Sequence, residues 1–423
     1  MGCNRTRILV WNPSPRLRIC FCSGSIGGLL YQQHYHHHRL GGVIRDLSTA
    51  RDMSPKNDSI PHELRTAAEP RQNKLHTVRL AHIEQINPTV RLLRLTLPSS
   101  SMGGDEESNQ QHQEPFAFLP GQWLDVHVPS IPQAGGFTIT STPADAQLLP
   151  CPEPVLQGSE QRSADAEGIA PTDAPLGRLP YVELAVQKSP SNPPAAWLWR
   201  PVDEILGKEL SVRVGGSFIW PPADIAIDQI RNVVFVAGGV GINPLISMLS
   251  HLSERETSDA PTSFALPDKN RNDPLSIHFL YSTRLPTESS SPVQLTESTL
   301  RQILFLPRLR QIVQRASSQP SNLHISLDLF LTNLPPSETA SATKLLGEGD
   351  EDGDLRVFPR RIAHDDLRLA ATTNANGGSH AGEGIPPQST VCYVCGPPPM
   401  TDDFVQYLRG LIGKERVLCE KWW

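Results

Sequence analysis

The chain has 423 residues, a formal net charge of −6 and 38% apolar residues. This length allows two or three domains, and the acidic balance argues against a nucleic-acid-binding protein, which usually presents a basic face. The 40 prolines and the modest apolar content predict two compact domains that carry long polar insertions. The sequence has no apolar run of 18 residues, so we expect no membrane-spanning helix.

The N-terminal segment differs from the rest of the chain. Its first 45 residues contain six Arg and neither Asp nor Glu. Such a composition is typical of a mitochondrial targeting segment, to which we assign residues 1–47, followed by a linker over 48–75. Two alternatives stay open: a lipid anchor through Gly2, whose surroundings fit the myristoylation pattern, and a tail with no targeting role.

Strand patterns dominate the next part of the chain. Residues 76–98 alternate apolar and polar groups, which predicts one or two half-buried strands. Further strand character is present at 116–128, 137–141, 181–187 and 209–214. With one short helix at 194–205, these strands predict a small antiparallel barrel over 76–222. Polar insertions are expected near 99–115 and 145–180.

The pattern changes at about residue 228. Continuous apolar runs, typical of parallel strands covered on both faces, occur at 233–237, 277–281, 324–331 and 391–394. Helical spacing is found at 245–252, 299–316 and 404–412. This alternation predicts a doubly wound α/β domain over 228–423. Its insertions are expected near 258–274, 287–293, 335–354 and 371–387.

The seven cysteines are scattered and do not form a disulfide framework. Cys392 and Cys395 make one C-x-x-C pair, and a metal site would need a second pair. Because both lie in an apolar run, we favour a structural role, with a redox disulfide as the alternative. We expect no metal site and no iron–sulfur cluster.

A glycine-rich motif joins the apolar run at 233–237 to the next helix. It reads Gly238-Gly239-Val240-Gly241-Ile242-Asn243-Pro244. Glycines let a backbone approach a ligand closely, Asn243 suits a helix N-cap and Pro244 suits the first helical position. The helix start would offer N–H groups to a pyrophosphate. The spacing is not G-x-G-x-x-G, so a tight turn without a ligand stays the alternative.

Two more motifs point to ligands. Cys395-Gly396-Pro397-Pro398-Pro399-Met400 follows the run at 391–394, at the strand end where parallel sheets bind ligands. A stiff connection is the alternative. Residues 120–122 (Pro-Gly-Gln) and 137–141 (Phe-Thr-Ile-Thr-Ser) come earlier, and the second of these strands could hydrogen-bond a polar ring edge. An ordinary strand with hydroxyls on its exposed face is the alternative there.

The motifs occur in the order found in the ferredoxin–NADP reductase superfamily, which the chain resembles over about residues 76–423 without the insertions. The C-terminal Cys-Glu-Lys-Trp-Trp and the Gly-Gly-Phe at 135–137 make it similar, within that superfamily, to the oxidoreductase NAD-binding domain-containing protein 1 group. The resemblance implies a two-domain fold, in which an antiparallel β-barrel flavin domain is followed by a doubly wound, parallel-sheet nicotinamide-binding domain.

For the flavin, the resemblance implies that Phe137 stacks on the isoalloxazine and Thr138 bonds to a ring atom. Gly135 stands where the family has the Arg that neutralises the flavin phosphate, so the choice between FAD and FMN stays open. Arg213 either supplies that charge or is a surface residue. The implied flavin contacts are Phe137, Thr138, Ile139, Ser141, Pro193 and Pro194.

For NAD(H) or NADP(H), the resemblance implies contacts from both glycine motifs. They are Gly238, Gly239, Val240, Gly241, Ile242, Asn243, Pro244, Gly396, Pro397, Pro398 and Met400. Cys395 takes the place of a Cys beside the nicotinamide and, with Thr138, is an implied catalytic residue. Arg284 is implied near the adenosine ribose, where it would pair with a 2′-phosphate, or else is a solvated surface residue.

The implied function is hydride transfer from NAD(P)H to a bound flavin, and on to a separate, unidentified electron acceptor. The alternative is a non-catalytic nucleotide-binding or assembly protein on a retained reductase fold, which the Gly135 departure supports. The resemblance also implies that Trp422 or Trp423 covers the flavin at the interdomain cleft, near Phe137 and Cys395. Packing of both tryptophans against the last helix is the alternative.

Overall fold

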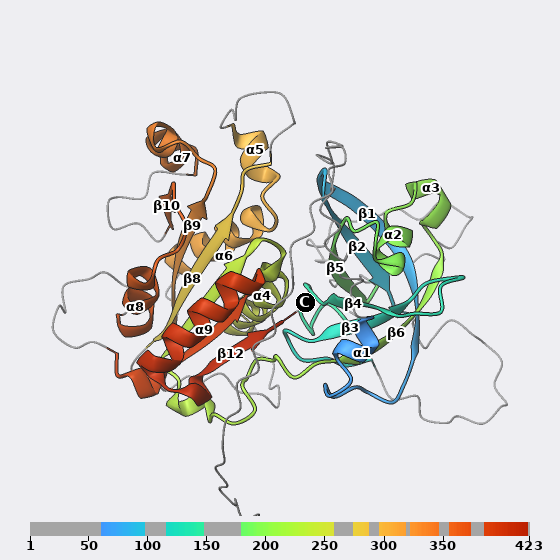
Figure 1. Cartoon of the computed structure of the whole chain (residues 1–423), viewed down its shortest axis with the longest axis horizontal. Coiled ribbons are helices and arrows are strands. Elements are labelled where there is room, and N and C mark those ends of the chain that lie inside the picture. The colour runs from blue at the N-terminus through green and yellow to red at the C-terminus, as the bar shows by residue number, and fades with distance from the viewer. Residues whose placement is uncertain are drawn as a thin grey trace, which may run out of the picture. The chain divides into compact units, whose positions relative to one another are not determined.

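The computed structural model describes eight segments of the chain. They are residues 61–97, 116–147, 179–257, 274–286, 296–318, 322–346, 355–373 and 385–421. The predicted targeting segment, most of the predicted insertions and the pair Trp422 and Trp423 lie outside the described residues. All the described residues belong to one compact unit that begins at Asp58, and they contain two six-stranded sheets (Figure 1).

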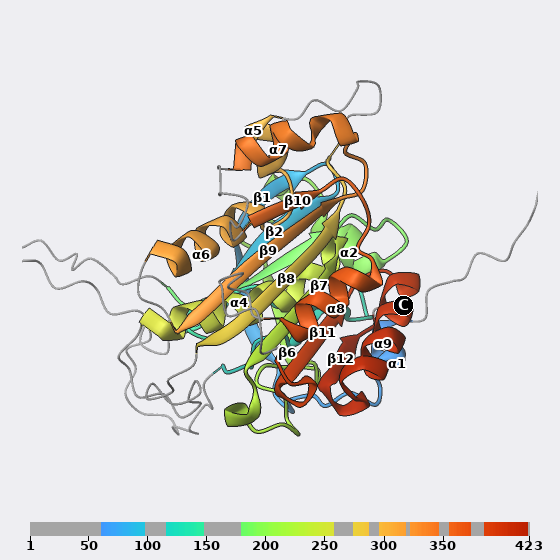
Figure 2. The ribbon, with the colours of Figure 1, turned by 90° about the vertical axis from the view of Figure 1, so that its left-hand side faces the viewer.

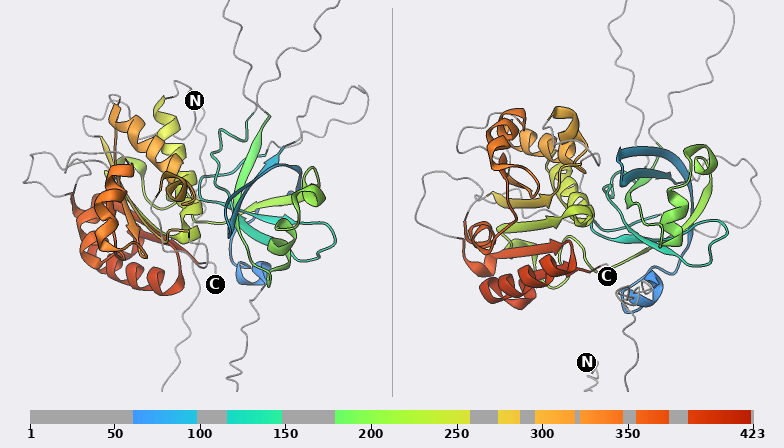
Figure 3. Two further views of the ribbon diagram at one scale, coloured as in Figure 1. Left: turned by 90° about the horizontal axis from the view of Figure 1, so that it is seen from above. Right: turned by 45° about the horizontal axis from the view of Figure 1, so that its top comes forward.

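The first sheet is antiparallel and barrel-like, as predicted. Its strands are β1 (His76–Asn87), β2 (Val90–Thr96), β3 (Trp123–His127), β4 (Gly135–Thr138), β5 (Tyr181–Gln187) and β6 (Glu209–Gly215). Their order is β4-β3-β6-β1-β2-β5. A bridge between Ile139 and Leu184 links the two ends of this order, and the strands curve around a common core (Figure 3).

The barrel core follows from the alternation of side chains along each strand. On β1, Val78 and Leu80 are buried while Arg79 between them is exposed. Leu80 pairs with Leu95 of β2, whose side chain is also fully buried. These inward residues and the apolar face of α2 (Pro193–Leu198) form one cluster.

Two predictions for the barrel need correction. The helix predicted at 194–205 is two short helices, α2 and α3 (Val202–Ile205), because Pro201 between them has no N–H and clashes with the preceding turn. The predicted linker, described from residue 61, holds α1 (His62–Arg65) and a bridge between Arg71 and Gly215. This part of the linker is therefore structured against the barrel.

The second sheet is parallel. Its strands are β7 (Asn232–Gly238), β8 (Leu275–Thr283), β9 (Leu323–Leu331), β10 (Leu355–Phe358), β11 (Thr390–Cys395) and β12 (Val417–Glu420). Their order is β10-β9-β8-β7-β11-β12, as Figure 2 shows. The chain runs outward from β7 to β10 and then returns to the other side of β7, which confirms the doubly wound prediction.

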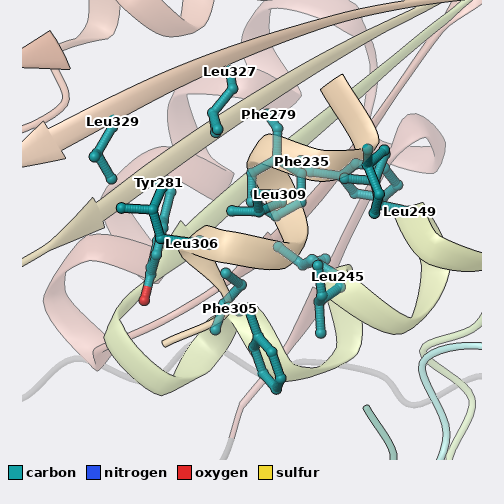
Figure 4. Packing of buried hydrophobic residues seen from close by; sticks show 14 of the residues in the cluster. Phe235, Leu245, Leu249, Phe279, Tyr281, Phe305, Leu306, Leu309, Leu327 and Leu329 are labelled. Atoms are coloured by element: carbon teal, nitrogen blue, oxygen red, sulfur yellow. The ribbon is translucent and has the colours of Figure 1, made fainter. Parts of the chain in front are cut away.

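Helices cover both faces of this sheet. They are α4 (Ile242–Thr257), α5 (Glu297–Arg301), α6 (Leu306–Ser318), α7 (Thr339–Leu346), α8 (His364–Thr372) and α9 (Pro398–Ile412). Phe235 of β7 packs with residues of α4 and α6 on one face (Figure 4). Its neighbours Val234 and Val236 pack with α8 and α9 on the other. Both faces of β7 are buried, as the continuous apolar run predicted.

The helix predicted at 299–316 is also broken. Phe305 has a φ of +59° between α5 and α6, so the helix cannot continue through it. The predicted insertion at 335–354 contains α7 up to Leu346, whose Ala342 and Leu346 join the core. Among the described residues, no helix has the length and apolar character needed to cross a membrane.

Candidate functional site

The site predicted from the two glycine motifs lies at the carboxyl ends of β7 and β11. These strands are neighbours at the centre of the parallel sheet. The chain leaves β7 toward β8 on one side and continues from β11 to β12 on the other. Ligands of open α/β sheets bind at such a switch point, because the two connections diverge and leave a crevice.

The two loops after these strands are packed against each other through glycine. A Cβ at Gly241 would overlap the carbonyl oxygen of Cys395, and a Cβ at Gly396 would overlap Cε of Met400. A Cβ at Gly238 would lie 2.7 Å from Cδ of Pro397. The glycines of both motifs are therefore needed for this close approach.

Gly239 differs from the other glycines of the loop. Its φ is +54°, and no atom lies within 4 Å of where its Cβ would be. It begins the single 3₁₀ turn Gly239–Gly241, which leads directly into α4. The start of a helix presents backbone N–H groups and the positive end of the helix dipole. The loop therefore has an open backbone surface suited to a pyrophosphate.

Asn243 and Pro244 do not play the predicted capping roles. The helix α4 begins at Ile242, so both residues lie inside its first turn. The Asn243 side chain instead donates from Nδ2 to the carbonyl of Ala185 at 3.0 Å. The N–H that Pro244 lacks would have no helical partner in the first turn, so a proline is tolerated there.

Cys395 is buried rather than presented to a ligand. It is 1% exposed, and burial raises the pKa of its thiol, with further rises from Glu420 and Cys419. The thiol is therefore neutral. Cys392 packs on the other face of the sheet, so the C-x-x-C pair cannot close a disulfide, in line with the structural interpretation. Among the described residues, no group of His, Cys, Asp and Glu could hold a metal ion.

The predicted flavin strand is β4 with the residues that follow it. Phe137 is half-buried and packs against the barrel core, while Thr138, Ile139 and Ser141 are buried. Where a Cβ of Gly135 would stand, the structure has the Phe137 ring and, at 2.7 Å, Cβ of Pro194. The position of the family's Arg is thus filled by the protein itself.

The hydroxyls after β4 are engaged within the protein. Thr140 Oγ1 donates to the backbone oxygen of Glu183 at 3.1 Å, and Ser141 Oγ accepts from the Glu183 N–H at 3.0 Å. Ser141, a predicted flavin contact, thus has its hydroxyl oxygen bonded to β5, and its proton stays available to a second partner. The hydrogen bonds of Thr140 and Ser141 to Glu183 do not involve Phe137 or Thr138, the two residues predicted to contact the flavin ring.

Arg213, the predicted source of the missing phosphate charge, is bound to a buried carboxylate of the barrel. Its guanidinium binds Asp125, with Nη2 to Oδ2 at 2.7 Å, and Arg71 and His62 bind the same carboxylate at 2.9 and 3.1 Å. Burial alone would raise the pKa of Asp125, but the hydrogen bonds from His62, Arg213 and Arg71 hold it well below its usual range. Because the partners of Asp125 are far apart in sequence, no local motif signalled this cluster.

The other predicted residues lie at the ends of elements. Arg284 directly follows β8 and is exposed, and Pro193 and Pro194 begin α2, whose N-cap Asn192 accepts from the Ala195 N–H. Trp423 is outside the described residues. The sequence did not predict a cavity of about 370 Å³ beside β12, whose barrel-side lining includes Trp123 and Phe218.

The residues fit the two expected cofactors unequally. The loops after β7 and β11 offer close-packed glycines and one open glycine, which suits a dinucleotide. The strand β4 offers Phe137 and Thr138 to a flavin ring, but it has no cation for the flavin phosphate. The glycine loops therefore suit the pyrophosphate of a dinucleotide, and β4 suits only the ring end of a flavin.

Comparisons with known proteins were made on sequence and on structure. A scan against models of protein families found no match. The search of solved structures found an Amycolatopsis cytochrome P450 reductase (TM-score 0.47, 15% identity, 84% of this chain and 71% of that one). It also found the CS-b5R domains of human Ncb5or (TM-score 0.46, 14% identity, 82% and 70%).

The sequence relatives share one name, oxidoreductase NAD-binding domain-containing protein 1. The Bos taurus protein is 27% identical over 365 residues, covering 86% of this chain and 85% of that protein. The Homo sapiens protein is 26% identical over 384 residues, with 90% of each covered. For Danio rerio, the values are 27% over 367 residues, with 86% and 97% covered. The predicted resemblance is thereby confirmed: over most of its length this chain is similar to the oxidoreductase NAD-binding domain-containing protein 1 group.

Proposed function

We propose that this chain is an NAD(P)H-dependent flavoprotein oxidoreductase. It binds the nicotinamide dinucleotide across the loops after β7 and β11, and its electrons pass through a flavin at β4 to a separate acceptor. The observation that carries the proposal is the close packing of Gly241 against Cys395 at the switch point, beside the open Gly239. The relatives' shared name supports both the nucleotide and the class of reaction.

The chain's own residues have distinct roles in this proposal. The backbone of Gly239–Gly241 and the start of α4 bind the pyrophosphate. Gly396 lies at the strand end that the nicotinamide approaches, and the neutral thiol of Cys395 packs in the core directly before it. Arg284 binds near the adenosine ribose. The cofactors carry the redox chemistry, so the task of these residues is to orient the nucleotide and to exclude water.

A bound flavin would supply a hydride acceptor that can release electrons one or two at a time. Phe137 and Thr138 hold its ring. Because Gly135 brings no cation to the phosphate, the chain itself favours neither FAD nor FMN.

A second candidate is nucleotide binding without redox chemistry. It is favoured by the filled space at Gly135 and by the binding of Arg213 to Asp125, which leave the flavin phosphate without its usual counter-charge. In that case the glycine loops alone would be functional.

One experiment separates the two candidates. The purified full chain is examined by absorption spectroscopy without air, before and after adding NADH or NADPH, and NAD⁺ binding is measured by calorimetry. A yellow chromophore that bleaches supports the oxidoreductase. Nucleotide binding by a protein that is colourless and takes up no added flavin supports the second candidate. A protein that binds neither nucleotide nor flavin contradicts both.

We also propose that residues 1–47 direct the protein to mitochondria. Their Arg-rich, acid-free composition supports the proposal. A fluorescent reporter that carries these residues should enter mitochondria, with or without a Gly2→Ala change. A reporter that stays in the cytosol, or that reaches membranes only with Gly2 intact, contradicts it.

A further inference from the structure

A buried carboxylate joins the barrel to a helix of the parallel sheet. Glu183 of β5 is 1% exposed. Its Oε1 accepts from Arg308 Nη2 of α6 at 2.6 Å, and the hydroxyl of Thr140 shares its one proton between this oxygen and the Glu183 carbonyl, each 3.1 Å away. Its Oε2 accepts from Arg94 Nε at 3.3 Å. A buried carboxylate is costly to leave unpaired, so these partners are needed to keep Glu183 in place.

Helices α4 and α6 also donate hydrogen bonds to three backbone carbonyls of the barrel. Arg308 Nη1 donates to the oxygen of Thr140 at 3.1 Å. Ser247 Oγ of α4 donates to the oxygen of Ser141 at 2.7 Å, and Asn243 of α4 binds Ala185. Arg308 thus uses its two terminal nitrogens on two different acceptors, a geometry that the single ammonium of Lys cannot reproduce.

These contacts link the two half-sites of the proposed function, which are the nucleotide loop after β7 and the flavin strand β4. Asn243 lies two residues after Gly241, at the end of the nucleotide loop. Thr140 lies two residues after Thr138, at the end of the flavin strand. The contacts of Asn243 and Thr140 therefore fix where the loop stands relative to the strand.

Arg308 follows a residue with an unfavourable backbone conformation. Phe305, just before α6, is buried and has a φ of +59°, a left-handed conformation that is unfavourable for a bulky residue. Its ring lies under the Arg308 guanidinium, 4.8 Å from the ring centre. Such conformations persist only where the surroundings determine them, and they cluster at functional sites.

We propose that Glu183 and Arg308 are positioning residues, which touch neither cofactor and hold the loop after β7 in a fixed position relative to β4. The inference rests on the proposed function, because only then do both half-sites have ligands. Hydride transfer demands donor and acceptor atoms within a few tenths of an ångström of their reactive arrangement, so a small displacement slows transfer without weakening binding.

Arg310 provides a matched control on the same helix. Its side chain is 31% exposed, against 30% for Arg308. It also binds one carboxylate, Glu297 at 3.1 Å, and one carbonyl, Leu346 at 3.1 Å. These partners belong to the α/β part of the chain and not to the barrel.

The experiment compares the full-length wild type with Arg308→Lys, Glu183→Gln and Arg310→Lys. Amide hydrogen exchange of residues 135–142 and 239–247 is measured with and without NAD⁺, and hydride transfer is followed by stopped flow at saturating nucleotide. In the wild type, NAD⁺ should slow exchange in both segments. In Arg308→Lys and Glu183→Gln, the loop stays protected, the strand loses its protection, and transfer slows by about tenfold or more. Arg310→Lys should match the wild type in both measurements.

The exchange measurement needs no bound flavin, so it can separate the possible failures. If the wild-type loop gains no protection from NAD⁺, the proposed nucleotide site and this inference are both wrong. If the loop is protected but the strand never is, or stays protected in Arg308→Lys, only this inference is overturned. Equal losses of stability in Arg308→Lys and Arg310→Lys, without a change in the protection of residues 135–142, would show that the contact between Glu183 and Arg308 only stabilises the fold.

Discussion

Single glycines in the loop after β7 have different tasks. Gly238 and Gly241 are closed in by Pro397 and Cys395, so they keep the loop in shape. Gly239 faces open space in a left-handed conformation. A methyl group there would meet no protein atom and would meet only a ligand. This separation makes Gly239 a specific probe of the nucleotide site.

Gly239→Ala should therefore weaken nucleotide binding beyond its effect on folding. The positive φ costs an alanine about 1 kcal/mol of stability. The methyl group should also reduce NAD⁺ affinity by about tenfold or more, since it stands where the pyrophosphate approaches. Gly207→Ala is the control, because Gly207 has a φ of +79° and lies in the barrel, away from the loop. Calorimetric titrations that give equal affinities for the two variants contradict the assignment.

A buried histidine on β8 predicts how stability depends on pH. His278 Nε2 lies 2.8 Å from the Thr373 oxygen and Nδ1 lies 2.9 Å from Ser326 Oγ. A carbonyl only accepts, so Nε2 carries the proton and Nδ1 accepts from the hydroxyl. Burial lowers the pKa of His278 to about 4 from its usual 6.5. The folded protein therefore keeps this imidazole neutral.

The unfolded chain gains a proton at His278 below pH 6.5, whereas the folded chain gains it only near pH 4. The contribution of His278 to the free energy of unfolding is fully present above pH 6.5. It should fall by up to about 3 kcal/mol as the pH drops to 4, at about 1.4 kcal/mol per pH unit. Urea unfolding at several pH values measures this slope. His278→Gln keeps one donor and one acceptor and should flatten it. An unchanged slope in that variant excludes His278 as the cause.

At the scale of elements, the His62 side chain packs α1 against β3 and β4. The His62 ring binds Asp125 at 3.1 Å and meets Trp123 edge-on, with ring centres 4.7 Å apart. A Cβ at Gly136 would overlap that ring. A glycine at position 136 of β4 is therefore required by a residue of the predicted linker.

A double-mutant cycle tests this contact. Gly136→Ala alone should destabilise the protein by about 1–3 kcal/mol, because the His62 ring cannot move without breaking its bond to Asp125. In a His62→Ala background, the same change should cost close to nothing, since the space is empty. Urea unfolding of the four proteins gives the coupling energy. Additive effects contradict the proposed contact.

The order of elements was predictable wherever a local pattern decided it. The apolar run at 233–237 and the alternation in β1 each determine burial by their own periodicity, and both predictions are confirmed. The helices at 194–205 and 299–316 were predicted as continuous because periodicity alone does not show that Pro201 and Phe305 interrupt them. The strand β12 and the helix α8 were missed because their positions depend on pairing and packing with distant segments.

In the candidate site, too, the features that depend on a local motif were predictable, and those that depend on distant partners were not. The loops of Gly238 and Gly396 follow strands, and the topology of parallel sheets brings such loops together. The role of Arg213 was not predictable, because its partner Asp125 is 88 residues away. The same holds for Asn243, whose side chain binds the barrel instead of capping its own helix.

At the scale of the whole molecule, the contacts between the two sheets predict joint unfolding. Besides Arg308 and Glu183, Tyr393 of β11 donates to the carbonyl of Ile219 at 2.9 Å. Four of the seven tryptophans lie in or just after the barrel strands, and residues 232–421 contain none. Tryptophan fluorescence therefore reports mainly on the barrel, whereas the nucleotide binds the other sheet.

NAD⁺ at a hundred times its dissociation constant should stabilise the protein by about 2.7 kcal/mol. If the sheets unfold together, the fluorescence transition in urea should shift by the same amount as the far-ultraviolet circular dichroism transition. A shift in circular dichroism alone would mean that the α/β sheet unfolds independently of the barrel.

The strand order also has a consequence for protein synthesis. On the ribosome, β7 is made well before β11, although the two are neighbours in the finished sheet. During the roughly ten to thirty seconds that ordinary rates of elongation imply, β7 has an unpaired edge and fully apolar faces. Such an edge is a template for pairing with other chains. Chaperones that act on nascent chains should therefore be needed most in the interval before β11 leaves the ribosome, and shortening that interval should improve the yield of folded protein.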